Sequence, residues 1–202
     1  MPLRGRRSTA TWRSGTATPV LIRGATSAVG QAALNLAVDA GARVLATTRT
    51  PGHVDRLRDL GAAEVLIDDG EIAAQVRAAH PHGIDGVLDR VGNSVLRDSL
   101  QCAGPHGRVC LIGFLGGLDP VPDFNPLADL PSGVALSTFA SAFVLGGESF
   151  PISDVPIQEI VYKAEQGVFD ARPSRVFTFD EIVEAHRVID AGRAGGKVVV
   201  TV

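Results

Sequence analysis

The feature that most constrains this chain is a short apolar run that stops at a glycine and leads into a helical segment. Residues 20–30 read Val-Leu-Ile-Arg-Gly-Ala-Thr-Ser-Ala-Val-Gly, and residues 31–40 continue with the pattern of a helix. A second apolar run, residues 44–48, follows. A strand, a glycine turn and a helix in this order direct free backbone N–H groups and the helix dipole at a phosphate. Ser27 and Ala28 stand where a second glycine is common, but the β-α-β context supports a dinucleotide site.

The end of the second predicted strand indicates which dinucleotide binds. An NAD site carries Asp or Glu there, which accepts a hydrogen bond from the ribose 2′-hydroxyl and repels a 2′-phosphate. Residues 47–50 of this chain read Thr-Thr-Arg-Thr, and the next acidic residue is Asp55. The planar, permanently charged guanidinium of Arg49 suits a phosphate. The sequence therefore favours NADP(H) over NAD(H), against the alternative that Arg49 is a solvated loop residue.

Apolar strands and amphipathic helices alternate along the chain from residue 20. Continuous apolar strands between helices are typical of a parallel sheet covered on both faces. The sequence therefore predicts an α/β fold: a doubly wound parallel (Rossmann) sheet with helices on both faces, plus a C-terminal strand-helix-strand tail. Right-handed crossovers place the carboxyl ends of the strands at one edge, where Gly24, Thr48, Asp68, Val91 and Gly113 are expected to line one crevice. Strands are expected at 20–23, 44–47, 64–67, 86–89 and 109–112, and helices at 29–40, 53–60, 71–80 and 93–102.

The composition excludes several classes of protein. The net charge is −3, which gives no indication of nucleic acid or an anionic membrane as a partner. No stretch of the sequence approaches the roughly 20 apolar residues of a membrane span. The two cysteines, Cys102 and Cys110, lack a CxxC spacing. We therefore expect no metal site, no disulfide framework and a reducing, cytoplasmic compartment.

The chain is expected to divide into three parts. Residues 1–18 are basic and contain no acid, which indicates a disordered or arbitrary leader, with an organelle transit peptide as the alternative. Residues 19–170 form the predicted Rossmann domain, and the apolar segment at 134–145 has the pattern of a sixth strand. Residues 171–202 form the tail. In this C-terminal third, a helix is expected at 153–167, a strand at 175–179, a helix at 180–191 and a strand at 197–202.

Seven short motifs, taken together, resemble one family and cover nearly everything after residue 20. They are similar to the zinc-independent branch of the medium-chain dehydrogenase/reductase superfamily, the NADPH:quinone oxidoreductase-like proteins. The resemblance implies NADPH as the cofactor and hydride transfer from its nicotinamide to a quinone or a small carbonyl-conjugated acceptor. The motifs are 24–30 (Gly-Ala-Thr-Ser-Ala-Val-Gly), 46–49 (Ala-Thr-Thr-Arg), 60–68 (Leu-Gly-Ala-Ala-Glu-Val-Leu-Ile-Asp), 88–92 (Leu-Asp-Arg-Val-Gly), 107–113 (Gly-Arg-Val-Cys-Leu-Ile-Gly), 179–187 (Phe-Asp-Glu-Ile-Val-Glu-Ala-His-Arg) and 194–200 (Ala-Gly-Gly-Lys-Val-Val-Val).

The resemblance also implies roles for single residues. The glycine turn binds the pyrophosphate, and Thr48 and Arg49 bind the 2′-phosphate. His53 stands where such proteins often have a second phosphate-binding lysine. The cofactor-binding residues of the turn are Gly24, Thr26, Ser27, Ala28, Val29 and Gly30, and those that approach the nicotinamide ribose and ring are Gly92, Gly113 and Phe114.

Relatives in this family begin with a barrel-like substrate domain, and here only the basic leader precedes the first predicted strand. The resemblance therefore indicates a truncated protein, a fragment or one half of an assembly. The strands at 175–179 and 197–202 would then have lost their sheet neighbours, and unpaired edges favour association. The family also implies a homodimer in which the segment between Val134 and Val144 pairs with its twin across a two-fold axis.

No catalytic residue can be assigned from the sequence. Short-chain reductases need a Tyr-x-x-x-Lys pair, and the only tyrosine, Tyr162, is followed four places on by Gln166. Asp89, at a strand end, is expected to cap the following turn. Two functions stay open: an NADPH-dependent reductase of a small-molecule quinone or enone, and a catalytically silent NADPH-binding module that senses redox state or serves in oligomerisation. Both bind the cofactor, so turnover separates them.

Overall fold

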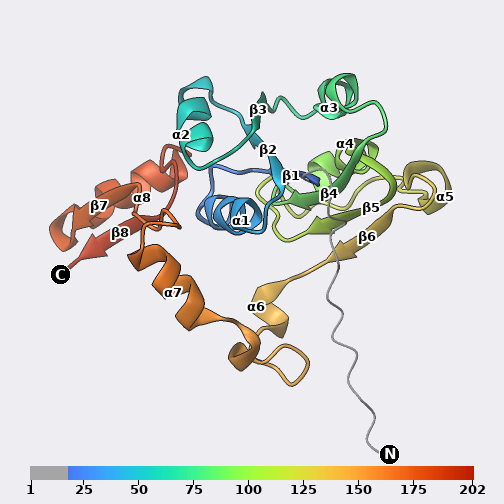
Figure 1. Ribbon diagram of the computed structural model, residues 1–202. Coiled ribbons are helices and arrows are strands. Elements are labelled where there is room, and N and C mark those ends of the chain that lie inside the picture. The colour runs from blue at the N-terminus through green and yellow to red at the C-terminus, as the bar shows by residue number, and fades with distance from the viewer. Residues whose placement is uncertain (1–17) are drawn as a thin grey trace, which may run out of the picture.

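A six-stranded parallel sheet forms the centre of the molecule (Figure 1). The computed structural model describes residues 18–202, so the expected leader lies, except for its last residue, outside the described residues. The strand order is β3-β2-β1-β4-β5-β6, with every neighbouring pair parallel. The predicted doubly wound sheet is confirmed. Its strands are β1 (Pro19–Arg23), β2 (Arg43–Thr48), β3 (Glu64–Ile67), β4 (Ile84–Asp89), β5 (Ala103–Leu111) and β6 (Ala135–Thr138).

Apolar side chains on both faces of the sheet build two cores. Leu21 belongs to the cluster beneath the helices α3 and α4, whereas its neighbour Ile22 belongs to the cluster beneath α1 and α2. Both side chains are fully buried, because successive residues of a strand point to opposite faces. Burial on both faces is why these strands read as unbroken apolar runs. The helices are α1 (Ala28–Asp39), α2 (Val54–Asp59), α3 (Ala73–Ala79) and α4 (Leu96–Cys102).

Several helices are shorter than the sequence predicted. The segments expected at 53–60 and 93–102 open with 3₁₀ turns, η1 (Pro51–His53) and η2 (Asn93–Val95). The helix expected from residue 153 begins later, as α7 (Ile157–Glu165), after the 3₁₀ turn η3 (Ile152–Asp154). Val155 precedes a proline and is extended (φ −80°, ψ 122°), because a proline disfavours the helical region for the residue before it.

Strand β5 begins well before the expected residue 109. The Gly/Pro-rich stretch at 104–107, between the expected helix at 93–102 and the expected strand at 109–112, lies inside the strand. The pairing of β4 with β5 shifts register between Ile84 and Gly86, and His106 has a positive φ of 68°. The glycines and proline therefore mark a bulge within a paired strand. The local sequence of such a bulge looks the same as that of a turn.

The sixth strand is also shorter than expected. β6 ends at Thr138, and a short helix, α6 (Ser141–Val144), takes the rest of the apolar segment. Phe139 packs edge-on against Phe150, with ring centroids 5.3 Å apart, while Phe143 is 89% exposed. The segment between Val134 and Val144 is thus not one continuous edge strand, since one of its aromatic rings is engaged within the chain. A four-residue helix, α5 (Pro126–Asp129), lies in the long loop before it.

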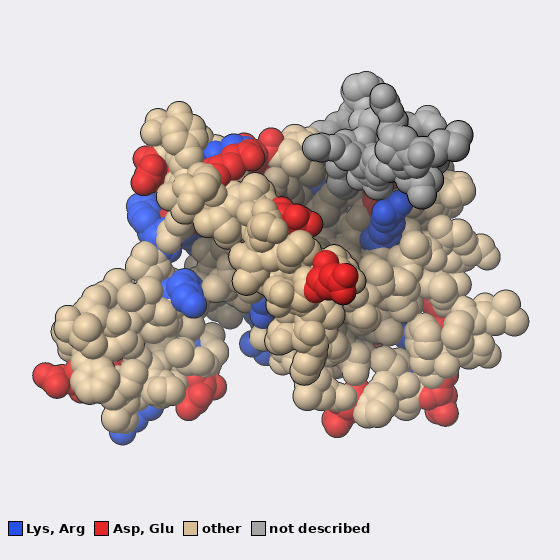
Figure 2. Space-filling view, turned by 90° about the horizontal axis from the view of Figure 1, so that it is seen from below, with Lys and Arg blue, Asp and Glu red and all other residues tan. Residues whose placement is uncertain are grey.

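The C-terminal tail forms a small unit of its own. β7 (Arg175–Thr178) and β8 (Val198–Thr201) pair in parallel as a two-stranded sheet, with α8 (Ile182–Asp190) between them and a 3₁₀ turn, η4 (Phe179–Glu181), before the helix. The expectation that these strands have no sheet neighbours is therefore wrong, because they pair with each other. In Figure 2 the unit stands at the left as a lobe set off from the main body.

Candidate functional site

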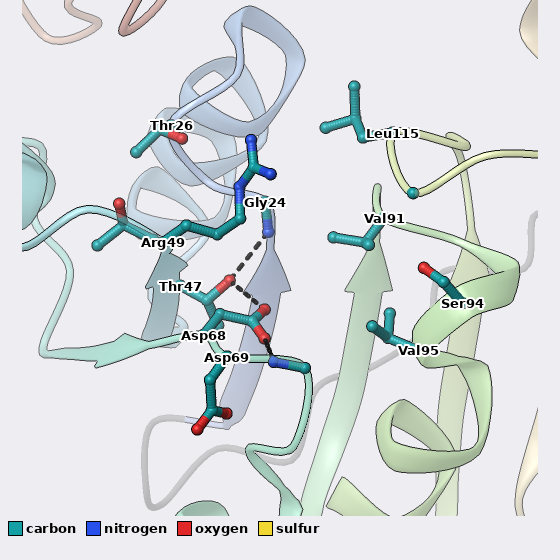
Figure 3. Close-up of a pocket in the computed structure, with 13 residues that line it drawn as sticks. Gly24, Thr26, Thr47, Arg49, Asp68, Asp69, Val91, Ser94, Val95 and Leu115 are labelled. Carbon is teal, nitrogen blue, oxygen red and sulfur yellow. Dashed lines mark hydrogen bonds between the residues drawn. The ribbon is translucent and has the colours of Figure 1, made fainter. Parts of the chain in front are cut away.

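A cavity of about 400 Å³ opens at the carboxyl edge of the sheet, between the ends of β1 and β4 (Figure 3). The strand order reverses at this point, which is where open α/β sheets bind their ligands. Gly24, Thr48, Asp68 and Val91 line the cavity as the sequence predicted, whereas Gly113 does not. The other lining residues are Thr26, Thr47, Arg49, Asp69, Gly70, Ser94, Val95, Leu115 and Gly116.

The glycine turn provides one wall through Gly24 and Thr26, whereas the next four predicted residues, at 27–30, lie behind the turn and do not line the cavity. Ser27 is the N-cap of α1: its Oγ accepts from the Gly30 N–H at 3.0 Å and donates to the Gly24 carbonyl at 2.9 Å. Within the described part of the chain, the backbone N–H groups of Ala28 and Val29 have no hydrogen-bond partner. These are the donors that the first turn of a helix leaves for an anion.

Gly30 is required by contact between the helix and the turn. A Cβ atom at this position would lie 2.5 Å from the Gly24 carbonyl oxygen and 2.7 Å from the Cα of Ala25. The sequence predicted that Gly30 approaches the pyrophosphate. In the structure the close approach is to the backbone of the turn, so this glycine shapes the turn from behind.

Arg49 extends into the cavity from the end of β2 (Figure 3). The preceding Thr48 fixes this turn, since its hydroxyl accepts from the Thr50 N–H and donates to the Thr50 carbonyl, both at 3.1 Å. Two carboxylates, Asp68 and Asp69, line the same cavity from the end of β3. These two acids are far from Arg49 in the sequence. They lie beside it in the structure because β3 pairs with β2.

The charge of Asp68 is matched by a buried arginine that sequence reasoning missed. Arg23, the last residue of β1, is 0% exposed and donates to both carboxylate oxygens of Asp68, at 2.9 and 2.8 Å. Burial alone raises the pKa of Asp68, but the hydrogen bonds and charge of Arg23 hold it below its ordinary value. A signal was available in the sequence, because a charged residue stands inside the apolar run before Gly24. A charge that is buried with its strand requires a partner of opposite charge.

Asp89 caps the turn that follows β4, as the sequence predicted. One carboxylate oxygen accepts from the N–H groups of Val91 at 2.7 Å and Gly92 at 2.9 Å. The other accepts from the Ser99 hydroxyl at 2.6 Å. Asp89 is fully buried, so it fixes the backbone at the edge of the cavity and is not itself available to a ligand.

The three residues expected at the nicotinamide end lie together beside the cavity but do not line it. A Cβ at Gly92 would lie 2.6 Å from the Gly113 carbonyl oxygen and 3.1 Å from the ring of Phe114. Below them, the buried Nε of Arg90 has no hydrogen-bond partner in the described part of the chain. It lies 3.2 Å from the Cβ position of Gly113.

His53 lies outside this cavity, in a neighbouring basic hollow. Its ring lies 3.1 Å from the Cβ position of Gly195, in the turn that precedes β8, and Arg49 comes within 3.8 Å of the Cβ position of Gly192 in the same turn. The C-terminal turn therefore contacts both basic residues, and it brings Arg193 to the same hollow. Arg193 was not predicted as a site residue. The signal that could have indicated it is a basic residue within a glycine-rich turn. The hollow is also lined by Arg56, Arg172, Pro173, Ser174, Arg175 and Ala194.

Comparison with known proteins identifies the family. The model described as "Zinc-binding dehydrogenase" matches residues 28–142, more than half of the chain. The chain belongs to the zinc-binding dehydrogenase family. The match to the family model, together with the solved structures that the chain resembles, confirms the resemblance to the medium-chain dehydrogenase/reductase superfamily.

A curated polyketide synthase and two solved structures are among the proteins similar to this chain. The chain is 29% identical over 200 residues to the highly reducing polyketide synthase tazB of Aspergillus terreus, and the match covers 89% of this chain and 7% of the synthase. It is 28% identical to the CurK enoyl reductase (TM-score 0.73; 92% of this chain, 55% of that one). It shares the fold of mycobacterial Rv1454c, solved in complex with NADPH (TM-score 0.78, 23% identity; 97% of this chain, 59% of that one). The chain thus spans 7% of the curated relative and just over half of either solved structure.

The residues of this dehydrogenase do not fit a zinc ion. In the range 18–202, no three His, Cys, Asp or Glu side chains lie close enough together to hold a metal. Cys102 is buried in α4 and Cys110 is half-buried in β5. No step proposed for this chain therefore involves a zinc ion. Within the same range, no helix is long and apolar enough to cross a membrane.

Proposed function

We propose that this dehydrogenase binds NADPH in the cavity at the ends of β1 and β4 and presents it for reduction of a carbonyl-conjugated double bond or a quinone. One observation carries the proposal: Thr26, in the glycine turn that leads into α1, and the guanidinium of Arg49 line one cavity at the switch point of the sheet. Helix N-terminal donors suit a pyrophosphate and a guanidinium suits a 2′-phosphate. The names of two relatives, an enoyl reductase and a highly reducing polyketide synthase, support the acceptor class.

The residues of the chain bind and orient the cofactor. The N–H groups of the turn and of α1 hold the pyrophosphate, and Thr48 and Arg49 hold the 2′-phosphate. Asp89 keeps the turn at Gly92 in place, and Phe114, which is 40% exposed, offers an apolar surface beside it. When bound, NADPH supplies the hydride for the acceptor. No described side chain is assigned as the proton donor.

Cofactor preference tests the proposal. Arg49→Glu replaces the phosphate partner by a carboxylate of the kind that NAD sites carry, so NADPH affinity should fall at least about tenfold, as expected for loss of a charge-assisted contact, while NADH affinity holds or rises. Calorimetric titration measures both. Arg187→Glu, in α8, makes the same change of charge at a side chain that is 70% exposed, and it should leave both affinities unchanged. Equal affinity of the unaltered protein for NADPH and NADH would refute the assignment.

We further propose that the C-terminal unit, residues 171–202, contacts a substrate-binding domain of the kind found in longer members of the superfamily. Support comes from the apolar side chains that the unit exposes, namely Val176, Phe179 and Val183, each more than half exposed. Turnover of NADPH with a small enone or quinone, alone and with such a domain added, tests this. Binding without turnover under both conditions would favour the alternative, a catalytically silent NADPH-binding module.

Self-association through the edge of the main sheet is a related proposal. β6 is the last strand of the sheet, and the exposed Phe143 lies just beyond it. An edge strand presents unpaired backbone groups that a second copy can satisfy. Sedimentation at micromolar concentration should show a dimer, and Phe143→Ser should weaken it. A monomer at every concentration would refute this.

A further inference from the structure

We propose that Arg23 determines cofactor preference by neutralising Asp68, which would otherwise oppose a 2′-phosphate at the neighbouring end of β2. The inference rests on the proposed NADPH site and adds a residue that does not contact the ligand. Arg23 is thus a positioning and specificity-determining residue. It lies beneath the cavity and acts through side chains that line it.

The contacts of Arg23 use its whole guanidinium. Nε and Nη2 donate to the two oxygens of Asp68, at 2.9 and 2.8 Å. Nη1 donates to Asp98 at 2.7 Å and to the Ser99 hydroxyl at 3.0 Å. The carbonyl oxygens of Val95 and Gly70 accept at 3.3 and 3.0 Å. A planar fork can serve acceptors on several sides at once, which lysine cannot.

These contacts reach the walls of the cavity. Asp68 accepts from the Thr47 hydroxyl at 3.1 Å, and that hydroxyl in turn accepts from the Gly24 N–H at 3.0 Å (Figure 3). Asp68 also accepts from the Gly70 N–H at 3.0 Å. Arg23 therefore holds Asp68 in a position from which it fixes both the glycine turn and the loop after β3.

The balance of charge beneath the cavity makes Arg23 an electrostatic residue as well. Three carboxylates surround it: Asp68, Asp98 and, through Ser99, Asp89. Their formal charge is −3 against +1 for Arg23, and both Arg23 and Asp89 are fully buried. Without the arginine, no positive side chain would balance these three carboxylates beneath the site of an anionic cofactor, and interactions between buried charges are only weakly screened by salt.

Asp68 is the carboxylate that matters for preference. Its backbone N–H donates to the Thr48 carbonyl at 2.9 Å, so it lies beside the residue that precedes Arg49. An NAD site carries an acid at the end of β2 that rejects a 2′-phosphate, and Asp68 brings a carboxylate next to that position from the end of β3. With Arg23 present the charge of Asp68 is satisfied from below, and the cavity accepts the phosphate although two acids line it.

The test is a set of three variants, titrated calorimetrically with NADPH and with NADH. Arg23→Gln should weaken NADPH binding by at least about tenfold and NADH binding by no more than about threefold, because only NADPH carries the extra phosphate. Arg23→Gln combined with Asp68→Asn should return the ratio of the two affinities to within about twofold of the unaltered protein. Asp68→Asn alone keeps the arginine, so it should fold if the first variant does not, and it should raise the ratio in favour of NADPH.

The outcomes separate this inference from the proposed function. An unaltered protein that binds neither cofactor refutes the proposed function and, with it, the role of Arg23. An unaltered protein that prefers NADPH, together with variants that lose both affinities in equal proportion, overturns the inference alone and shows that Arg23 serves only folding. The same conclusion follows if Asp68→Asn leaves the ratio unchanged or lowers it. Recovery of the ratio in the double variant supports the inference, since a purely structural loss would grow when a second partner is removed.

Discussion

Substituting alanine for Gly30 is predicted to damage both the stability of this protein and its proposed cofactor site. The added Cβ would lie 2.5 Å from the Gly24 carbonyl oxygen, and 2.7 and 2.8 Å from the Cα and carbonyl carbon of Ala25. All three are backbone atoms, so no side chain can rotate away. The turn itself has to move, and with it the N–H groups proposed to hold the pyrophosphate.

Two opposing terms set the magnitude. Alanine in a helix is favoured over glycine by about 1 kcal/mol. Overpacking of a tight contact typically costs about 1–3 kcal/mol, and a contact with three backbone atoms belongs at the upper end. The net loss is then about 1–2 kcal/mol, which for a domain of this size lowers the melting temperature by roughly 2–8 °C.

Urea unfolding followed by circular dichroism, and titration with NADPH, measure the two effects. We expect a loss of stability in this range and an NADPH affinity at least about tenfold weaker. Gly52→Ala is the matched control, since a Cβ there meets nothing within 4 Å and should change stability by less than about 0.5 kcal/mol. A Gly30→Ala protein that unfolds and binds NADPH like the unaltered chain would refute the reasoning.

Three further predictions follow from burial and charge. Leu100→Ala removes a fully buried side chain and should cost about 2–5 kcal/mol in urea unfolding, whereas Leu127→Ala, at a side chain that is 94% exposed, should cost almost nothing; similar losses would contradict the assignment of the core. Hydrogen bonds from Arg172 and a second arginine hold the pKa of Asp170 below its ordinary value, so its contribution to stability is present above about pH 4 and is lost as the pH falls below that. In Asp170→Asn, the free energy of unfolding should therefore fall less between about pH 4 and pH 2 than in the unaltered protein. The same fall in both proteins would count against the pairing of Asp170 with the arginines. Burial raises the pKa of Cys102 to about 12, so maleimide at pH 8 should label it only after unfolding, and rapid labelling of the native protein would show that the thiol is accessible.

The sequence was sufficient for the order of the elements because their hydrophobic patterns are local. A run such as Val-Leu-Ile before Gly24 has one interpretation once a helix and a second apolar run follow. The bulge at 104–107 and the late start of α7 depend on pairing with β4 and on the backbone before Pro156. The periodicity of apolar side chains along the sequence predicts neither the bulge nor the late start of this helix.

The site shows the same division. Arg49 could be predicted because it follows directly from the end of a strand. Arg23 was missed because its partners lie 45 and 75 residues further along the chain. The pairing of β7 with β8 was missed for a related reason. The backbone groups at the edge of a strand can form hydrogen bonds with any other strand edge that the chain brings near. Long-range choices of partner therefore account for most of what the sequence alone did not reveal.

The position of Arg23 also bears on the order in which the chain folds. The first β-α-β unit, when it leaves the ribosome, contains the arginine but neither carboxylate that matches it, and a partly formed sheet could bury that charge only at a considerable cost. We therefore expect β1 to settle in the sheet only together with the segments that carry Asp68 and Asp98. Residues from 19 to 111 should therefore assemble in one cooperative event, with no stable intermediate made of the first strands alone.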